Sequence, residues 1–210
     1  MSDEESAPEN LPVRVLGAQP FWHHGPVRRD VVYVPASPNY GARFHVAGGP
    51  GAWYASSTEQ GAWAELFRHF LDDGVDPFEV RRRMGRVRVD GLRVLDLADG
   101  ANCMALGITW DDLTSDDYAQ CQRVAHLARE RGLDGILSPS AALAGAATLV
   151  VFEGATHQIT VELSRVRTPP PRLADLLGRI RLRRDMPREV RTLFRYVESL
   201  GGEAIRRRRR

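Results

Sequence analysis

Residues 43–65, RFHVAGGPGAWYASSTEQGAWAE, begin with an arginine, end with a glutamate and carry a tyrosine at their midpoint. The Gly- and Pro-rich part at 46–51 predicts a loop, and AWYAS at 52–56 predicts a strand. A helical pattern follows. Arg43, Tyr54 and Glu65, each eleven residues apart, are thus expected at a loop–strand junction, inside a strand and in the first turns of a helix.

The helix that begins near Ser56 is expected to pack through one apolar face. Ser56 and Glu59 have the spacing of a capping box, in which each side chain bonds the other residue's backbone N–H group. Apolar residues then recur at i, i+3, i+4 and i+7, namely Trp63, Leu66, Phe67 and Phe70. Glu65 lies at the flank of this stripe, where its side chain can reach a cleft while the helix stays packed.

Outside this segment, apolar runs bounded by turn residues predict further elements. They are a strand at 30–35, two strands within 87–99, a helix at 114–132, two strands within 134–154 and a strand at 157–167. Asp90-Gly91 indicates a hairpin between the two strands within 87–99, and Gly132 ends the helix. Because helices and strands do not alternate regularly, the sequence favours an α+β fold.

The chain is expected to form one domain with extensions, because 210 residues suffice to bury a core. Residues 1–19 are acidic and contain proline, which predicts a disordered tail rather than a signal peptide. Residues 20–166 hold the predicted elements of the domain. Residues 167–210 comprise a stiff Pro-rich linker, a helical C-terminal appendage and an arginine tail.

Composition narrows the class of protein. A net charge of +2 does not indicate a strong polyanion binder, and the arginine clusters at 81–93 and 206–210 are more often solvated faces than nucleic-acid contacts. Cys103 and Cys121 are too few for a disulfide framework. No apolar run approaches the roughly 18 residues of a membrane span. These features predict a cytoplasmic protein that does not insert into a membrane.

Several kinds of site lack their motif. His23 and His24 are adjacent, but no HExxH or Cys/His pattern accompanies them, so no metal site is expected. No GxSxG elbow supports a serine hydrolase, and the loop at 46–51 has neither a dinucleotide nor a Walker phosphate pattern. Cys103 and Cys121 are expected to pack as small apolar side chains.

Arg43, Tyr54 and Glu65 remain as candidates for chemistry. Each has a simple alternative reading: a surface cation, an aromatic residue at the edge of the core, and an exposed helix residue. If loop, strand and helix direct them into one crevice, they offer an anion-binding guanidinium, a stacking ring and a carboxylate. These groups suit a substrate with a pyrophosphate, a flat cationic ring and a ribose.

Four segments, in this order, resemble those of the RES domain family, bacterial toxins that degrade NAD and are usually paired with a DNA-binding antitoxin. They are ARFH (42–45), WYASSTEQGAWAE (53–65), LDLAD with LGITWDDLTSDDYAQCQ (95–99 and 106–122), and GLDGILSPSAALAGAATLVVFE (132–153). The first resembles the family's Gly-Arg-aromatic segment, and the second resembles its Tyr-to-Glu segment. The last is similar to its Pro-Ser-containing ending.

The resemblance implies an ADP-ribosyltransferase-like split β-sheet core around an NAD cleft, with cleavage of the nicotinamide–ribose bond by phosphate or water. It implies no cofactor or metal, because NAD+ is the substrate and inorganic phosphate the candidate co-substrate. By position, it gives four catalytic residues: Glu65 to stabilise the ribosyl cation, Arg43 to bind phosphate oxygens, Tyr54 to stack on nicotinamide, and Ser140 to orient the ribose or the acceptor. His23 and Ser56 are further candidates for substrate binding.

Two positions depart from the family pattern. His23 stands where many members have an arginine, and an imidazole is not permanently charged. Ala119 stands where some members have a site serine. Both departures predict a changed acceptor or a weaker activity.

Two alternatives stay open at this point. The first is a mono-ADP-ribosyltransferase that modifies a macromolecule. Such enzymes often carry a second acidic residue two positions before the catalytic glutamate, and here that residue is Trp63. The second is a nucleic-acid- or protein-binding module without catalysis, although direct nucleic-acid binding through the arginine tail is not favoured. An Xre-type DNA-binding antitoxin is the partner that the resemblance implies.

Overall fold

The computed structural model of the protein describes residues 11–35, 37–72 and 80–168. Its strands are β1 (Val13–Val15), β2 (Gln19–Gly25), β3 (Ala52–Ser56), β4 (Arg82–Val89), β5 (Arg93–Asp96), β6 (Gly135–Pro139), β7 (Ala147–Phe152) and β8 (Ile159–Arg167). Its helices are α1 (Glu59–Asp72), α2 (Gly100–Ala105), α3 (Trp110–Thr114), α4 (Ala119–Glu130) and the 3-10 helix η1 (Glu153–Gln158). The first ten residues and the C-terminal appendage predicted beyond the linker lie outside this description.

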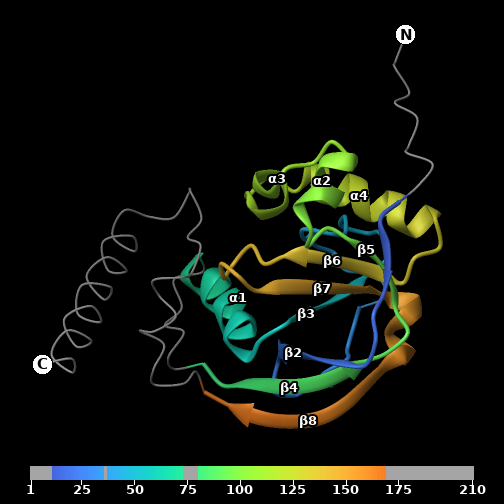
Figure 1. The fold of residues 1–210 in the computed structure, drawn as a ribbon. Helices are drawn as coiled ribbons and strands as arrows, with labels where there is room; N and C mark the ends of the chain where they lie inside the picture. The colour runs from blue at the N-terminus through green and yellow to red at the C-terminus, as the bar shows by residue number, and fades with distance from the viewer. Residues whose placement is uncertain (1–10, 36, 73–79, 169–210) are drawn as a thin grey trace, which may run out of the picture.

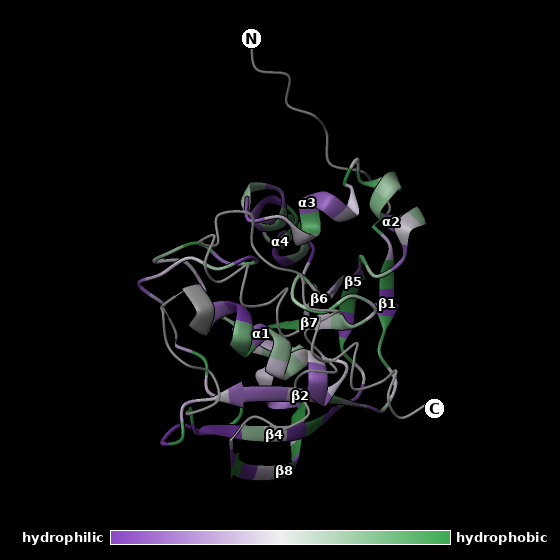
Figure 2. Ribbon diagram, turned by 90° about the vertical axis from the view of Figure 1, so that its left-hand side faces the viewer, coloured by the Kyte–Doolittle hydropathy of each residue, from purple (hydrophilic) through white to green (hydrophobic). Residues whose placement is uncertain are grey.

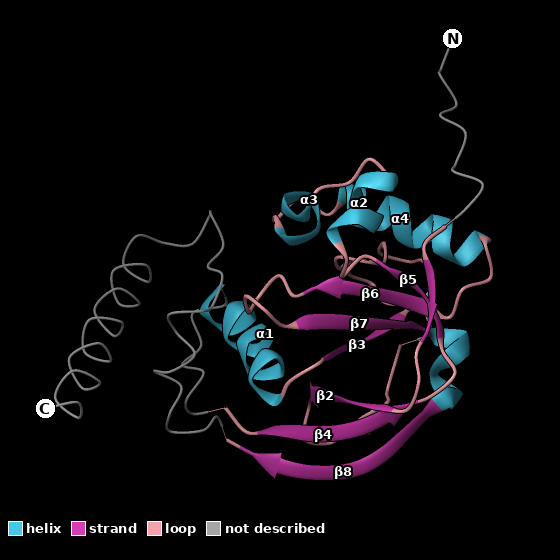
Figure 3. Cartoon of the chain, in the orientation of Figure 1, coloured by secondary structure: helices cyan, strands magenta, loops and turns pink. Residues whose placement is uncertain are grey.

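Within the described residues, the eight strands form one sheet in the order β1-β5-β6-β7-β3-β2-β4-β8 (Figure 1). Neighbouring strands are antiparallel except β5 and β6, which run parallel. Helices α2, α3 and α4 gather beside β5 and β6, whereas α1 lies beside β2 and β3 (Figure 3). This mixed arrangement confirms the α+β class.

The sheet is split between β2 and β3. These two strands share a single register pair, Trp22 with Ser56, whereas β2 pairs with β4 along its whole length and β3 pairs with β7 along its whole length. Beyond Trp22 the two strands therefore separate, and side chains rather than backbone bonds must bridge them. The expected split-sheet core is confirmed, and the split creates the space for the site.

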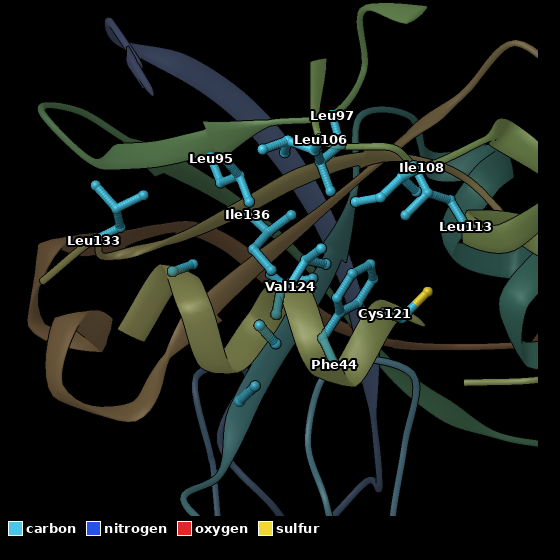
Figure 4. Close-up of a cluster of buried hydrophobic side chains, with 14 of the residues drawn as sticks. Phe44, Leu95, Leu97, Leu106, Ile108, Leu113, Cys121, Val124, Leu133 and Ile136 are labelled. Atoms are coloured by element: carbon cyan, nitrogen blue, oxygen red, sulfur yellow. The ribbon is translucent and has the colours of Figure 1, made fainter. Parts of the chain in front are cut away.

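Buried apolar residues fill both sides of the sheet. Phe44, Val124, Ile136 and Cys121 belong to the cluster between α4 and the strands (Figure 4). Cys103 and Cys121 are both buried, as expected of small apolar side chains. On β4 and β8, hydrophilic and hydrophobic residues alternate (Figure 2). In β4 this period-2 pattern matches one buried face, whereas β8, at the edge of the sheet, has no buried residue.

The main predicted strands and the first predicted helix are confirmed. AWYAS forms β3, the helix after it is α1, and Trp63, Leu66 and Phe67 are fully buried in the cluster beneath α1. Residues 134–154 give the buried strands β6 and β7, and β8 lies at one edge of the sheet.

Three local predictions were wrong because partners distant in sequence decide the structure. Residues 30–35 form a turn rather than a strand, since Val31 packs over Gly85 and its carbonyl accepts a bond from Trp53 Nε1 at 2.8 Å. Residues 13–15, expected in a disordered tail, form β1 and pair with β5. The turn at Asp90-Gly91 makes no hairpin, because β4 pairs with β2 and β8 while β5 pairs with β1 and β6.

Two predicted helix starts were also wrong, for local reasons. The helix predicted over 114–132 starts at Ala119, because residues 115–118 form a loop between α3 and α4; its end at Gly132, with φ of +63°, is confirmed. At α1, Thr58 rather than Ser56 caps the helix, since Thr58 Oγ1 accepts from Gly61 N at 3.0 Å. Ser56 lies one turn earlier, at the end of β3.

Candidate functional site

A cavity of about 730 Å³ opens where β2 and β3 separate. Its wall includes residues from β2, β3 and α1 and from the loops at 33–45 and 116–118. A cavity of this size, between two halves of a split sheet, is typical of a small-molecule site. Of the six predicted site residues, five line it: His23, Arg43, Tyr54, Ser56 and Glu65.

Glu65 lines the cavity, and Ser140 is bonded to it from the buried side. Ser140 Oγ donates to Glu65 Oε1 at 3.2 Å. Ser140 Oγ also accepts from the backbone N–H groups of Ala142 at 3.2 Å and Leu143 at 3.0 Å. Ser140 is only 1% exposed, so it stands behind Glu65 rather than at the cavity surface. The two backbone donors orient the hydroxyl so that its hydrogen points to the carboxylate, and the hydroxyl in turn fixes the carboxylate.

Tyr54 contributes its ring to the cavity and keeps its hydroxyl in the protein. The hydroxyl oxygen accepts from Phe44 N at 3.1 Å and lies 3.0 Å from His45 Nδ1. Burial raises the pKa of Tyr54, so the phenol is neutral at physiological pH. The ring is therefore held at both ends, by the strand and by the 43–45 loop.

Arg43 is tied to the loop between α3 and α4. Its Nη1 donates to the carbonyls of Leu113 at 3.0 Å and Ser115 at 2.7 Å, and the guanidinium lies over the ring of Tyr118, 4.7 Å from its centroid. The sequence predicted a cation directed at a substrate. The structure adds a second task, since Arg43 also joins the β3 side of the cavity to the loop at 115–118.

His23 bridges the split in the sheet. Its Nδ1 donates to the carbonyl of Tyr54 at 2.6 Å, which replaces the backbone bond that the separated β2 cannot supply. Burial lowers its pKa to about 4, only partly offset by the bond to the Tyr54 carbonyl, and nearby Arg82 lowers it further. His24 has a lowered pKa for the same main reason. At neutral pH, His23 therefore cannot replace the positive charge of the arginine common in the family.

The stability of the fold should depend on this neutral histidine. Between pH 6.5 and pH 4 the unfolded chain binds a proton at His23 and the native state does not, so the free energy of unfolding falls as the pH falls, by about 3 kcal/mol from this residue. His23→Asn keeps a donor for Tyr54 and does not titrate. The variant should lose about 3 kcal/mol less than the parent over this interval, measured by urea unfolding at several pH values.

The matched control for that experiment is His126→Asn. His126 lies on α4 with its side chain 74% exposed, paired with Glu130. This variant should follow the pH dependence of the parent protein. An equal flattening in both variants, or none in His23→Asn, would show that His23 does not titrate as described.

Ser56 is buried at the base of α1. Its Oγ accepts from Thr58 N at 3.4 Å and donates to the carbonyl of Ala147 at 3.5 Å. A side chain on Gly61 would collide with the same oxygen, so α1 approaches β3 closely at this point. These contacts give Ser56 a local task at the cavity wall, and its predicted contact to a substrate stays a prediction.

Arg68 and Asp116 also line the cavity, although neither was predicted from the sequence as a site residue. The Arg68 side chain is 5% exposed; Nη1 donates to the carbonyl of Ala141, and Nη2 pairs with Asp116 Oδ1 at 2.5 Å. One signal could have found Arg68: it lies three residues after Glu65 and thus on the same helix face. His45, which supports Tyr54, follows Arg43 by two residues and had no comparable signal.

Two further observations concern the chemistry that the site can support. Trp63, two residues before Glu65, is 1% exposed and packed in the core beneath α1, so no second acidic group stands there. Among the described residues, no three His, Cys, Asp or Glu side chains gather as metal ligands.

No helix in the described ranges has the length and apolarity to span a bilayer.

Comparison with known proteins identifies the family of this chain. The RES domain model matches residues 11–186. The probable NAD(+) phosphorylase Rv3189 of Mycobacterium tuberculosis is 54% identical over 190 residues, which are 90% of this chain and 91% of that protein. In fold, the chain is similar to one in the crystal structure of the M. tuberculosis MbcT-MbcA toxin-antitoxin complex, with a TM-score of 0.66 and 24% identity over 74% of this chain and 87% of the other. The family model covers most of the sequence, and the chain belongs to the RES domain family.

Proposed function

We propose that this chain is an NAD+ phosphorylase, which cleaves the bond between nicotinamide and ribose in NAD+ and transfers ADP-ribose to inorganic phosphate. The observation that carries the proposal is the Glu65 carboxylate, held by the Ser140 hydroxyl at 3.2 Å at the wall of a dinucleotide-sized cavity. A relative that is 54% identical over nine-tenths of the chain is named a probable NAD(+) phosphorylase, which supports the same reaction.

The chemistry requires a fixed negative charge. When the C1′–N1 bond breaks, its electron pair passes to the nicotinamide nitrogen, and positive charge develops on the ribose ring. A carboxylate placed beforehand beside that ring stabilises the transition state more than the ground state. Glu65 is assigned this role. Ser140 is assigned a positioning role, because it is buried behind the carboxylate.

The remaining predicted residues are assigned to binding. Tyr54, whose ring lines the cavity and whose hydroxyl is fixed, is proposed to stack on nicotinamide. Arg43 is proposed to bind the pyrophosphate. Both of its backbone bonds come from Nη1, one of three guanidinium nitrogens, so it can hold the loop and a phosphate oxygen together. His23, being neutral, is proposed to serve the shape of the cavity rather than its charge.

A phosphate or water acceptor fits better than a protein side chain. The position from which a second acidic group would activate a protein acceptor is Trp63, which is buried in the core. Glu65 therefore has no second acidic group at that position to deprotonate a macromolecular nucleophile. The transferase alternative has no comparable observation in its favour.

An enzyme that consumes NAD+ in this way is harmful to the cell that makes it. We therefore propose that the chain acts as a cytoplasmic toxin restrained by a cognate antitoxin of the Xre-type DNA-binding class. The similar fold in the MbcT-MbcA structure was crystallised as a toxin-antitoxin complex, which supports this pairing at the level of the fold.

The proposal is tested with purified protein and NAD+ labelled in the ADP-ribose part. Free nicotinamide and a labelled small molecule should accumulate in equal amounts, with no label on protein or nucleic acid added to the reaction. Label on a macromolecule would support the transferase instead. Constant NAD+ with excess protein would leave only a binding module.

A further inference from the structure

Arg68 stands beside the proposed catalytic carboxylate. It lies three residues after Glu65 on α1, so both side chains project from one helix face, and both line the cavity. Its side chain is 5% exposed. A guanidinium buried at that depth needs acceptors for its charge, and it has two of different kinds.

The two acceptors of Arg68 differ in how easily they can be exchanged. The carbonyl of Ala141 belongs to the buried backbone next to Ser140 and is fixed by the fold. The carboxylate of Asp116 lies on the 115–118 loop, its side chain is 24% exposed, and it bonds Nη2 through Oδ1 at 2.5 Å. Asp116 can move toward water if another anion takes its place at Arg68, whereas the Ala141 carbonyl is fixed by the backbone.

An acceptor phosphate that binds near Glu65 needs a positively charged side chain as its partner. Inorganic phosphate near neutral pH is a mixture of monoanion and dianion. The dianion, which is the nucleophile, has to approach the ribose between the Glu65 carboxylate and the pyrophosphate of NAD+. Both groups repel it. Among the cavity-lining arginines, Arg43 is already assigned to the pyrophosphate of NAD+, and Arg29 lies over Tyr33 at 4.5 Å. Arg68 is the arginine that shares a helix face with Glu65.

We propose that Arg68 binds the acceptor phosphate and that Asp116 occupies the same position until phosphate displaces it. This inference rests on the proposed function and specifies its second substrate. A guanidinium presents paired N–H donors that match carboxylate and phosphate oxygens alike, so one anion can replace the other at Nη2. The phosphate carries the larger charge, and the displaced carboxylate is rehydrated.

The reaction at this position balances without a base. The C1′–N1 bond breaks and its electron pair goes to nicotinamide, which leaves as a neutral molecule. A lone pair of the phosphate dianion forms the new C1′–O bond, and the product is ADP-ribose 1″-phosphate. No proton has to leave the nucleophile, whereas attack by water must release one. A site with a bound phosphate and a carboxylate that is not a base therefore favours phosphorolysis.

Asp116→Asn separates this proposal from a purely structural role. The variant removes the competing charge and leaves Arg68 intact. The phosphate KM should fall by roughly 3- to 10-fold, with the KM for NAD+ unchanged, since one charged hydrogen bond to the competitor is weakened. If Asp116 only positions Arg68, the phosphate KM should rise instead. A rise or an unchanged value would overturn the proposal.

Two variants complete the experiment. Asp117→Asn removes the same charge from the same loop and keeps an oxygen for Ala119 N, so it should leave the phosphate KM unchanged. Arg68→Lys keeps the positive charge and loses the paired N–H donors of the guanidinium. It should raise the phosphate KM by roughly 10-fold or more and shift the product toward ADP-ribose. Equal changes in both KM values would contradict a phosphate-specific role, and a failure of this variant to fold leaves Asp116→Asn to decide.

A binding measurement tests the phosphate site separately from the proposed reaction with NAD+. Inorganic phosphate alone is titrated into the parent protein and Asp116→Asn by calorimetry, without NAD+. Tighter binding of phosphate to the variant would support the phosphate site, whatever the activity. If the parent protein then does not consume NAD+, the proposed reaction is contradicted while the phosphate site stands. Equal binding to both, or none to either, would overturn the phosphate site whatever the activity.

Discussion

Glu65→Gln is expected to lower kcat for NAD+ cleavage by roughly 10³-fold, the size of effect seen when a preorganised electrostatic group is removed from an active site. Glutamine keeps the shape of the side chain and can still accept from Ser140 Oγ, which lies 3.2 Å from Glu65 Oε1. Only the charge that faces the developing ribosyl cation is lost. The Kd for NAD+ should therefore change by less than about 3-fold, because ground-state binding needs that charge little.

The measurement is a single-turnover rate together with a direct NAD+ titration. Glu130→Gln is the control, since Glu130 is an exposed residue of α4 whose side chain is 59% accessible. It should have the parent rate. A Glu65→Gln variant that cleaves NAD+ at the parent rate, or that loses rate only in proportion to binding, would remove Glu65 from the mechanism.

Ser140→Ala should be the most destabilising change at the site, by about 3 kcal/mol in the free energy of unfolding, because it leaves two buried N–H groups without an acceptor. These are the backbone groups of Ala142 and Leu143, both bonded to Ser140 Oγ. The same change releases Glu65, so kcat should also fall, by roughly 10-fold or more in the folded fraction.

Ser138→Ala is the matched control for Ser140→Ala. Ser138 is equally buried and lies in β6, but its hydroxyl donates only to the neighbouring carbonyl of Pro139 at 3.3 Å. This variant should lose no more than about 1 kcal/mol and keep the parent kcat. Urea unfolding and steady-state kinetics of both variants give the comparison. Equal destabilisation by the two changes would mean that the bonds of Ser140 do not hold the 140–143 turn.

Local pattern was sufficient for the elements that pack directly on the core. The period of Trp63, Leu66 and Phe67 predicted α1, and uninterrupted apolar residues predicted β6 and β7, because burial of one face or of both leaves its mark in the sequence itself. The separation of Arg43, Tyr54 and Glu65 into loop, strand and helix was predicted for the same reason, and the structure places all three at one cavity.

The errors in strand assignment occurred where the partner is distant in sequence. Nothing local in residues 30–35 indicates that Trp53 takes the carbonyl of Val31, and nothing in Asp90-Gly91 indicates that the next strand joins a different part of the sheet. β1 needs β5 to be a strand at all. Local propensity is a weak prior that tertiary pairing overrides.

The sequence indicated which residues belong to the candidate site better than it indicated what each side chain contacts. The family resemblance gave Ser140, yet only the coordinates show that it is buried behind Glu65 and bonded to two N–H groups. It also gave His23 as a substitute for an arginine, and its burial shows why the imidazole stays neutral. Arg68 was missed because arginines on helices are common and its acceptors lie 48 and 73 positions away in sequence.

The central claim, that phosphate rather than water accepts the ADP-ribose from NAD+, is tested most directly by product mass. The purified protein is incubated with NAD+ and ordinary phosphate in ¹⁸O-labelled water. The account predicts ADP-ribose 1″-phosphate without ¹⁸O, formed in the same amount as nicotinamide and lost when phosphate is omitted. ADP-ribose that carries ¹⁸O and forms equally well without phosphate would contradict it.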